Sequence, residues 1–169
     1  MMVRGPLFLF PLLTFLGVPP RSAVVERCES VRCRCITALD RGISAEELVR
    51  RQREYATRVV LGRVVRIDSL APRLVEHGPN RVEVRNLAAR VAVSRIWKGP
   101  LVDTLTVVFG STPIVSSCDL TLQAGSSYVI FAVRYDDGAL RTRQCTGTAA
   151  EVDATATISA LGAAQEPKK

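Results

Sequence analysis

The chain has 169 residues, of which 47% are hydrophobic and 23% are charged. This balance fits one ordinary globular domain and excludes a long disordered or low-complexity protein. Lysine and arginine total 23 against 16 acidic residues, and the chain holds five cysteines and one histidine, His77. Most metal sites and nucleophilic triads need a well-placed imidazole, so we expect no metal site, no cofactor and no enzyme activity.

The first 23 residues are predicted to be a signal peptide that is removed on export. Arg4 supplies a positive start, residues 6–18 form an uncharged apolar run, and the small residues Ser22 and Ala23 precede the expected cleavage site. A permanent transmembrane anchor is the weaker alternative, because the apolar run is short for a hydrocarbon core of roughly 30 Å. We therefore expect a mature chain that starts at Val24, or at Ala23 if cleavage follows Ser22, is secreted or periplasmic, and has no stable membrane span.

The mature chain is expected to begin its regular structure with a helix over residues 45–56. Ser44 and Glu47 form a capping box, in which the serine hydroxyl accepts from a free helix amide and the glutamate bonds back to the cap amide. The arginines at positions 50, 51 and 53 are interpreted as the solvated face of this helix. The sequence thus predicts one charged, amphipathic helix ahead of the first strand.

Five strands are predicted after this helix. The first, over residues 57–70, changes phase at Gly62, which predicts a β-bulge there. Residues 71–80 are punctuated by proline and glycine and are expected to form a loop that carries His77. The turn at 136–138 offers Gly138 for a positive φ, so the last strand pairs back from it toward Cys145. The other strands are expected over residues 81–97, 104–109, 127–135 and 139–143, with a loop carrying Cys118 over 110–119.

The aromatic side chains of the mature chain are predicted to lie in the core. Trp97 ends an alternating strand and is interpreted as a core plug. A second helix is expected over residues 149–161, closed by Gly162, and a flexible tail over 163–169. The aromatic residues concerned are Tyr55, Trp97, Phe109, Tyr128, Phe131 and Tyr135.

Together these elements predict a mainly β fold, specifically a five-stranded OB-type Greek-key barrel with a helix before the first strand and a C-terminal helix. A parallel sheet is disfavoured because its crossover connections need helices between the strands. The domain is expected to span residues 24–162.

Several short motifs occur in a fixed order along the chain. In this order and spacing the chain resembles the netrin-like domain of tissue inhibitors of metalloproteinases and its bacterial relatives, over about residues 33–162. The resemblance implies an OB-type fold and an extracytoplasmic protein-binding or inhibitory role. The motifs are Cys33-Arg34-Cys35, Gly62-x-Val64, Ile96-Trp97-Lys98-Gly99, Cys118, Gly125-x-x-Tyr128-x-x-Phe131-Ala132 and Cys145-Thr146.

Five cysteines cannot all pair within one chain, so at least one is left over. Cys33 and Cys35 point to opposite sides if their segment is extended, which favours two separate partners for them. The resemblance implies the pairs Cys33–Cys118 and Cys35–Cys145, with Cys28 as the free or intermolecular thiol. The alternative, a thiolate metal site, lacks imidazole partners.

The resemblance also implies which residues contact a protease. In that family the first cysteine of the C-x-C is the mature N-terminus, and its α-amino group and carbonyl oxygen chelate the protease zinc. Those roles fall here on Cys33, the specificity-pocket role falls on Arg34, and Cys35 completes the contact segment. Cleavage after Ala23 leaves nine residues ahead of Cys33, so we expect weak or no inhibition unless the chain is trimmed after Arg32.

The expected function is therefore an exported, disulfide-stapled protein-binding module, whose partner is an extracellular zinc metalloproteinase or another envelope protein. The alternative is a structural or ligand-binding module of the cell envelope that does not inhibit. A nucleic-acid binder is a weaker class, because export, few stacking aromatics and interspersed acidic residues argue against it. An enzyme is the weakest class, because one loop histidine and scattered carboxylates supply no nucleophile and base at a recognisable spacing.

Overall fold

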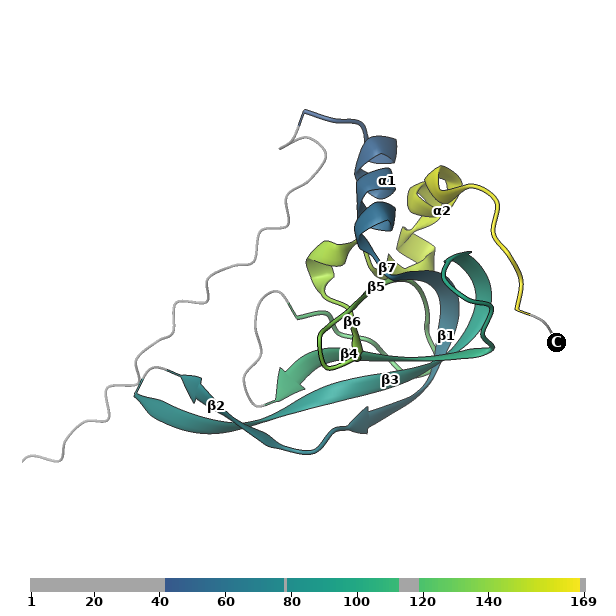
Figure 1. Ribbon diagram of the computed structural model, residues 1–169. Helices are drawn as coiled ribbons and strands as arrows, with labels where there is room; N and C mark the ends of the chain where they lie inside the picture. The colour runs from purple at the N-terminus through teal and green to yellow at the C-terminus, as the bar shows by residue number, and fades with distance from the viewer. Residues whose placement is uncertain (1–41, 78, 113–118, 168–169) are drawn as a thin grey trace, which may run out of the picture.

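The computed structural model describes residues 42–77, 79–112 and 119–167. Over these residues the protein is mainly β, with one mixed sheet of seven strands and two α-helices that lie side by side at one end (Figure 1). The helices are α1 (Ala45–Tyr55) and α2 (Thr155–Leu161), and two 3-10 turns are η2 (Gln144–Thr146) and η3 (Glu151–Asp153). The strands are β1 (Arg58–Ser69), β2 (Arg73–His77), β3 (Asn80–Lys98), β4 (Thr104–Thr112), β5 (Ser127–Arg134), β6 (Leu140–Arg141) and β7 (Ala149–Ala150).

Helix α1 confirms the first predicted helix, and its start has the expected N-cap. The Ser44 hydroxyl accepts a hydrogen bond from the Glu47 amide at 3.1 Å, which satisfies one of the free amides of the first turn. The Glu47 carboxylate, expected to bond back to the cap, instead accepts from Arg50 and Arg51. Val49 is buried against the sheet, so the helix docks through its one apolar stripe.

The first part of strand β1, Val59 to Gly62, is buried on both faces and separates two hydrophobic clusters. Val60 and Val64 belong to the larger cluster, which is lined by β1, β3, β4 and β5. Val59 and Leu61 belong to the smaller cluster, which fills the space between the sheet and the two helices. Trp97 completes the smaller cluster with 7% of its surface exposed, which confirms its predicted place in the core.

The strands pair in the order β1–β3–β4–β6–β5, and β5 also pairs with β1. β1 pairs antiparallel with β3 and with β5, β3 pairs with β4, and the short β6 pairs with both β4 and β5. The β4–β6 pairing is parallel, which makes the sheet mixed. The β1–β3 register shifts between Leu61 and Gly62, at the predicted position, and the extra residue of this irregularity is Ser94 on β3. A Cβ at this glycine would come within 2.6 Å of the Ala92 carbonyl oxygen, so the close approach of the two backbones requires glycine.

Three segments differ from their predicted structure. Residues 71–80, expected to be a loop, contain β2, because the long strand β3 offers residues 80–84 as a pairing partner. The last predicted strand shrinks to Leu140–Arg141, although it pairs back on β5 as expected. The helix expected over 149–161 begins at Thr155, because Ala149 and Ala150 pair with the edge of β5 as β7. At β2 and β7, pairing with a neighbouring strand outweighs a weak local preference.

Two aromatic side chains predicted to be buried are exposed. Tyr55 is 72% exposed in the last turn of α1, and Tyr135 is 40% exposed just beyond β5. Tyr135 lies under the Arg141 guanidinium, whose central carbon is 4.7 Å from the ring centroid, so a cation–π contact covers one ring face. The other four aromatic residues are buried as predicted.

The segment after α2, expected to be a flexible tail, contains contacts with the sheet. The Ile96 and Gln165 backbones exchange two hydrogen bonds of 2.8 Å. The Trp97 indole donates to the Gly162 carbonyl oxygen at 2.9 Å. These contacts hold the chain beyond α2 against the end of β3. No helix in the described ranges is both long enough and apolar enough to cross a membrane.

Candidate functional site

Most of the predicted site residues lie outside the described part of the chain. They are Cys28, Cys33, Arg34, Cys35 and Cys118. Cys145 is the one cysteine that the structure describes, and it is exposed on η2 and disulfide-bonded. Its partner lies outside the described residues, so the pairing of Cys35 with Cys145 stays a prediction. Cys145 marks where the predicted site meets the described fold.

Three threonines hold the chain on both sides of Cys145. The Thr142 and Thr148 hydroxyl oxygens lie 2.6 Å apart, and the Thr146 hydroxyl lies 3.2 Å from that of Thr142. The Phe131 amide donates to Thr148 Oγ1 at 2.9 Å, and Thr142 Oγ1 donates to the Phe131 carbonyl at 3.0 Å. β6 and β7 pair with the two ends of β5, and the threonine hydroxyls satisfy the backbone amide and carbonyl of Phe131 in the unpaired middle of that edge. The network thereby fixes the backbone that carries Cys145.

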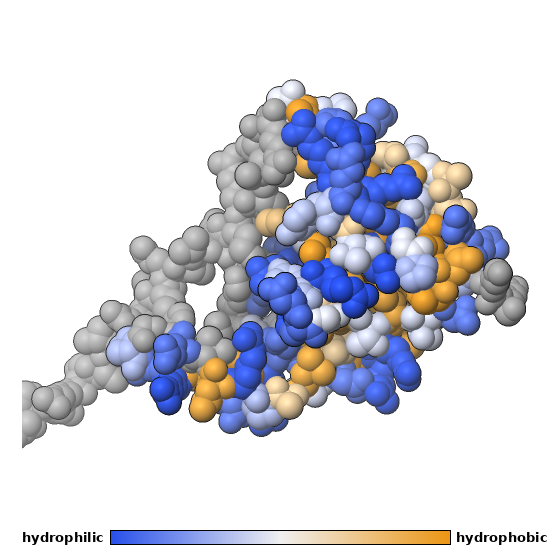
Figure 2. Space-filling model, in the orientation of Figure 1, coloured by the Kyte–Doolittle hydropathy of each residue, from blue (hydrophilic) through white to orange (hydrophobic). Residues whose placement is uncertain are grey.

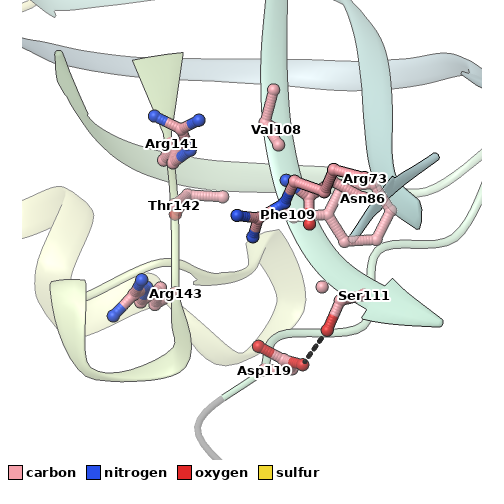
Figure 3. A pocket seen from close by; sticks show the side chains of 10 residues that line it. Arg73, Asn86, Val108, Phe109, Ser111, Asp119, Arg141, Thr142 and Arg143 are labelled. Carbon is pink, nitrogen blue, oxygen red and sulfur yellow. Dashed lines mark hydrogen bonds between the residues drawn. The ribbon is translucent and has the colours of Figure 1, made fainter. Parts of the chain in front are cut away.

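A cleft of about 120 Å³ lies at the ends of β4 and β6, close to this network (Figure 3). Figure 3 shows the Arg73 guanidinium projecting into the space between β4 and Thr142, whereas Arg143, at the rim, has its guanidinium turned away from Arg73. Asp119 is the one carboxylate of the lining, and it accepts a hydrogen bond from Ser111 at 3.4 Å. The polar lining residues are Arg73 of β2, Asn86 of β3, Ser111 of β4, Asp119, Arg141 and Thr142 at β6, and Arg143.

The three arginines of the cleft differ in how their charge is balanced. Arg141 Nη1 donates to Asp137 Oδ1 at 2.8 Å, and a second hydrogen bond joins the same two side chains. These hydrogen bonds lower the pKa of Asp137 to about 2 and raise the pKa of Arg141. Arg73 and Arg143 form no ion pair with any residue in the described ranges. Arg73 therefore brings to the cleft a guanidinium that has no ion pair among the described residues, beside the Asp119 carboxylate of the same lining.

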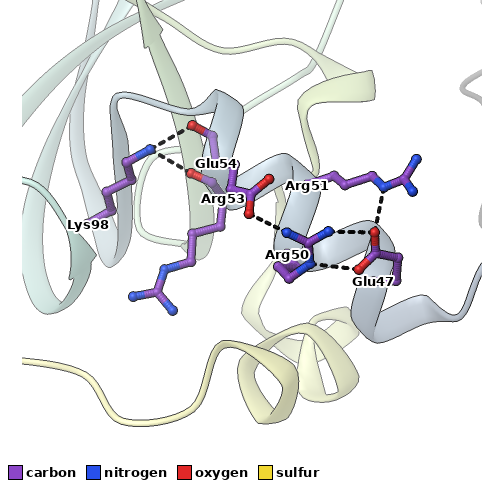
Figure 4. Close-up of polar contacts among 6 residues, drawn as sticks. All are labelled: Glu47, Arg50, Arg51, Arg53, Glu54 and Lys98. Atoms are coloured by element: carbon purple, nitrogen blue, oxygen red, sulfur yellow. Dashed lines mark hydrogen bonds and ion pairs between the residues drawn. The ribbon is translucent and has the colours of Figure 1, made fainter.

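A second polar cluster, at the end of α1, fastens the helix to the sheet. Lys98 Nζ donates to the carbonyl oxygens of Arg53 and Glu54 at 2.8 and 2.7 Å, which satisfies free carbonyls of the last turn (Figure 4). Arg53 donates to the Trp97 carbonyl at 3.0 Å, so its predicted place on a purely solvated face is wrong. Its geometry is that of a structural clamp.

The predicted solvated face is correct for Arg50 and Arg51. Both are exposed, and hydrophilic side chains cover the part of the surface over α1 in Figure 2. Their hydrogen bonds, with that from Arg50 the stronger influence, lower the pKa of Glu47 to about 2. Charge on this face is therefore balanced within the helix.

Among the described residues, no three or more histidine, cysteine or acidic side chains gather in a group suited to a metal ion. A comparison with protein-family models and a comparison with curated proteins each find no match to this chain. The resemblance to the netrin-like domain therefore depends on the order and spacing of the sequence motifs.

The cleft itself was not predicted from the sequence. Arg73 falls in the segment expected to be a loop, and arginine is too common in this chain to mark a site by itself. The available signal was the alternation of Arg141 and Arg143 just before Cys145, since alternate residues of an extended strand share a face. Nothing local connects these residues with Asn86, which lies far away in the sequence.

Proposed function

We propose that this chain is an exported, disulfide-stapled protein-binding domain built on a five-stranded OB-type Greek-key barrel. The pairing order β1–β3–β4–β6–β5–β1, with β4 and β6 parallel, supports the barrel because each of these five strands has a neighbour on both sides. β2 and β7 are then additions at its margins. The contacts of α1 and α2 with Val59 and Phe131 support a position of the helices on the outer surface of such a barrel.

The observation that carries the proposal is the disulfide bond at Cys145. Structural disulfides persist in oxidising compartments, which supports export. Asp119, the residue after Cys118, lines the same cleft as Arg143, two residues before Cys145. These are the two positions to which the netrin-like family ties its C-x-C segment. The pairs Cys33–Cys118 and Cys35–Cys145 would therefore hold the protease-contact segment beside this cleft.

In its exported form the protein is proposed to be at best a weak inhibitor of zinc proteases. With nine residues ahead of Cys33, its nitrogen belongs to a planar amide and has no lone pair to offer a metal. Arg34 would also bring a guanidinium into a typical apolar pocket, at a desolvation cost of several kcal/mol. A trypsin-like cut after Arg32 would free the Cys33 amine, whose ordinary pKa of about 7.7 leaves a neutral fraction at physiological pH.

Inhibition assays on three forms of the chain test this mechanism. One form starts at Val24, one starts at Cys33, and the third starts at Cys33 with its α-amino group acetylated. Against the same panel of zinc metalloproteinases, the form with the free Cys33 amine should inhibit at least about tenfold more tightly than the others. The acetylated form is the matched control because it differs only at the amine. Equal inhibition by the Val24 form would exclude amine chelation, and no inhibition by any form would favour the non-inhibitory envelope module.

The disulfide assignment has a separate test. Non-reducing peptide mapping of the exported protein should recover Cys33 joined to Cys118 and Cys35 joined to Cys145, with Cys28 outside both pairs. Each bond closes a long loop and is expected to stabilise the fold by roughly 4 to 5 kcal/mol through the lost entropy of the unfolded chain. A peptide that joins Cys28 to Cys118 or Cys145 would contradict the assignment.

A further inference from the structure

We propose that the cleft around Arg73 binds one carboxylate group from an acidic side chain of the protein partner. The inference rests on the proposed protein-binding function and adds the chemistry that the partner must present. Arg73 and Asn86 are proposed as the main donors, with Arg143 at the rim. None of their side chains takes part in the threonine network or in the clamp at α1.

Some hydrogen-bond donors in the cleft lining have partners within the fold, and others have none among the described residues. Arg141 is held by Asp137 and Tyr135, and Ser111 donates to Asp119. Within the described ranges, by contrast, Arg73 and Arg143 have no ion pair and the Asn86 side chain has no hydrogen bond. Arg73 and Asn86 come from the paired strands β2 and β3, and the Arg73 guanidinium projects into the cleft (Figure 3).

The size and charge of the cleft favour a single small oxyanion. Its volume of about 120 Å³ is well below the roughly 300 Å³ at which pockets for drug-sized ligands begin. A guanidinium presents parallel N–H groups that match the two oxygens of a carboxylate. The small volume and the guanidinium geometry together fit one carboxylate group.

The position of the cleft favours a carboxylate carried by a protein. Its lining includes Asp119, the residue after Cys118, and Arg143, two residues before Cys145 in the sequence. The proposed disulfides at these two cysteines would hold the protease-contact segment beside the cleft. A partner that docks on this segment therefore brings its own surface over Arg73. Charge pairs of this kind at the edge of an interface guide association and fix its orientation.

Binding of short peptides to the mature chain, followed by NMR, tests the proposal. The probes are acetyl-Gly-Asp-Gly-amide, the matched acetyl-Gly-Asn-Gly-amide, and sodium sulfate. The aspartate peptide should cause saturable shifts of the Arg73 Nε–H and Asn86 side-chain amide signals, whereas the asparagine peptide should cause none. Arg73→Gln should weaken binding of the aspartate peptide, read from the Asn86 signal, at least about tenfold. Arg95→Gln, which removes an exposed charge elsewhere on β3, should leave it unchanged.

Each remaining outcome counts against the proposal. No shift with the aspartate peptide, an equal shift in Arg73→Gln, or a response to sulfate alone would overturn it, the last because it describes a free-anion site. Backbone spectra of both variants show whether they remain folded. Peptide binding is measured without a protease. If the aspartate peptide binds but the form that starts at Cys33 does not inhibit, the result contradicts the proposed function alone. Inhibition without peptide binding would contradict this inference alone.

Discussion

Replacing Thr148 with valine tests whether the threonine network stabilises the middle of β5. The substitution keeps the shape of the side chain but removes the hydroxyl that accepts from the Phe131 amide at 2.9 Å. Thr148 is 6% exposed and Phe131 is fully buried, so water cannot replace the lost acceptor. An unpaired buried donor costs about 1–3 kcal/mol, and we expect the free energy of unfolding to fall by about 2 kcal/mol.

Urea denaturation of the oxidised protein, followed by the fluorescence of Trp97, measures this change. With a slope of roughly 1–3 kcal/mol per molar urea, the midpoint should fall by about 1 M while the slope stays the same. Thr106→Val on β4 is the matched control, because Thr106 is exposed and its change should stay within about 0.5 kcal/mol. If both variants shift the midpoint equally, the network does not stabilise β5 and the reasoning fails.

Three further changes test other contacts of the fold. Gly62→Ala places a Cβ within 2.6 Å of a backbone carbonyl oxygen on β3, so the two strands must separate, and thermal unfolding should show a loss of about 2–3 kcal/mol. The carboxyl carbon of Asp137 should titrate near pH 2 by NMR and return toward the ordinary value of 3.8 in Arg141→Gln. Because folding lowers the pKa of Asp137, the ion pair stabilises the fold above the unfolded pKa, and this stabilisation is lost as the pH falls through the folded pKa. A difference in the free energy of unfolding between wild type and Arg141→Gln that does not change with pH would contradict this. Trp97→Phe removes the 2.9 Å hydrogen bond to the Gly162 carbonyl oxygen, so the free energy of unfolding should fall by about 1 kcal/mol. The Gln165 amide should then exchange its hydrogen with solvent faster. An unchanged exchange rate would show that the indole does not hold this segment.

Local chemistry in the sequence determined the elements whose causes lie within a few residues. Ser44 starts α1 through its own side chain, whatever the helix later packs against. Gly62 marks the register shift between β1 and β3 because it interrupts an alternation that the neighbouring valines make clear. Gly138 has a φ of 79°, which permits the turn between β5 and β6. Val59 and Val60 lie on opposite faces of β1, as alternation along a strand requires.

Tertiary structure alone decided the elements that need a partner from elsewhere in the chain. β7 exists because β5 has a free edge next to Ala149, whereas β2 is a local exception that pairs with the residues directly after it in β3. β6 is short because the Thr142 and Thr148 hydroxyls replace backbone pairing at Phe131. Neither the secondary-structure preference of the residues nor their hydrophobic periodicity predicts these pairings, since both describe one segment at a time.

The same distinction applies to the candidate site. The cysteines could be singled out from the sequence, because their chemistry is rare and export makes disulfides favourable. The cleft could not, because Arg73, Asn86 and Arg143 are common residues that become neighbours only when β2, β3 and the segment after β6 are brought together. What makes Arg73 distinctive is also tertiary: Arg141 finds a carboxylate four residues away at Asp137, whereas Arg73 projects into the cleft with no acidic partner among the described residues. Charge balance depends on distances in space, and the folded sheet sets those distances.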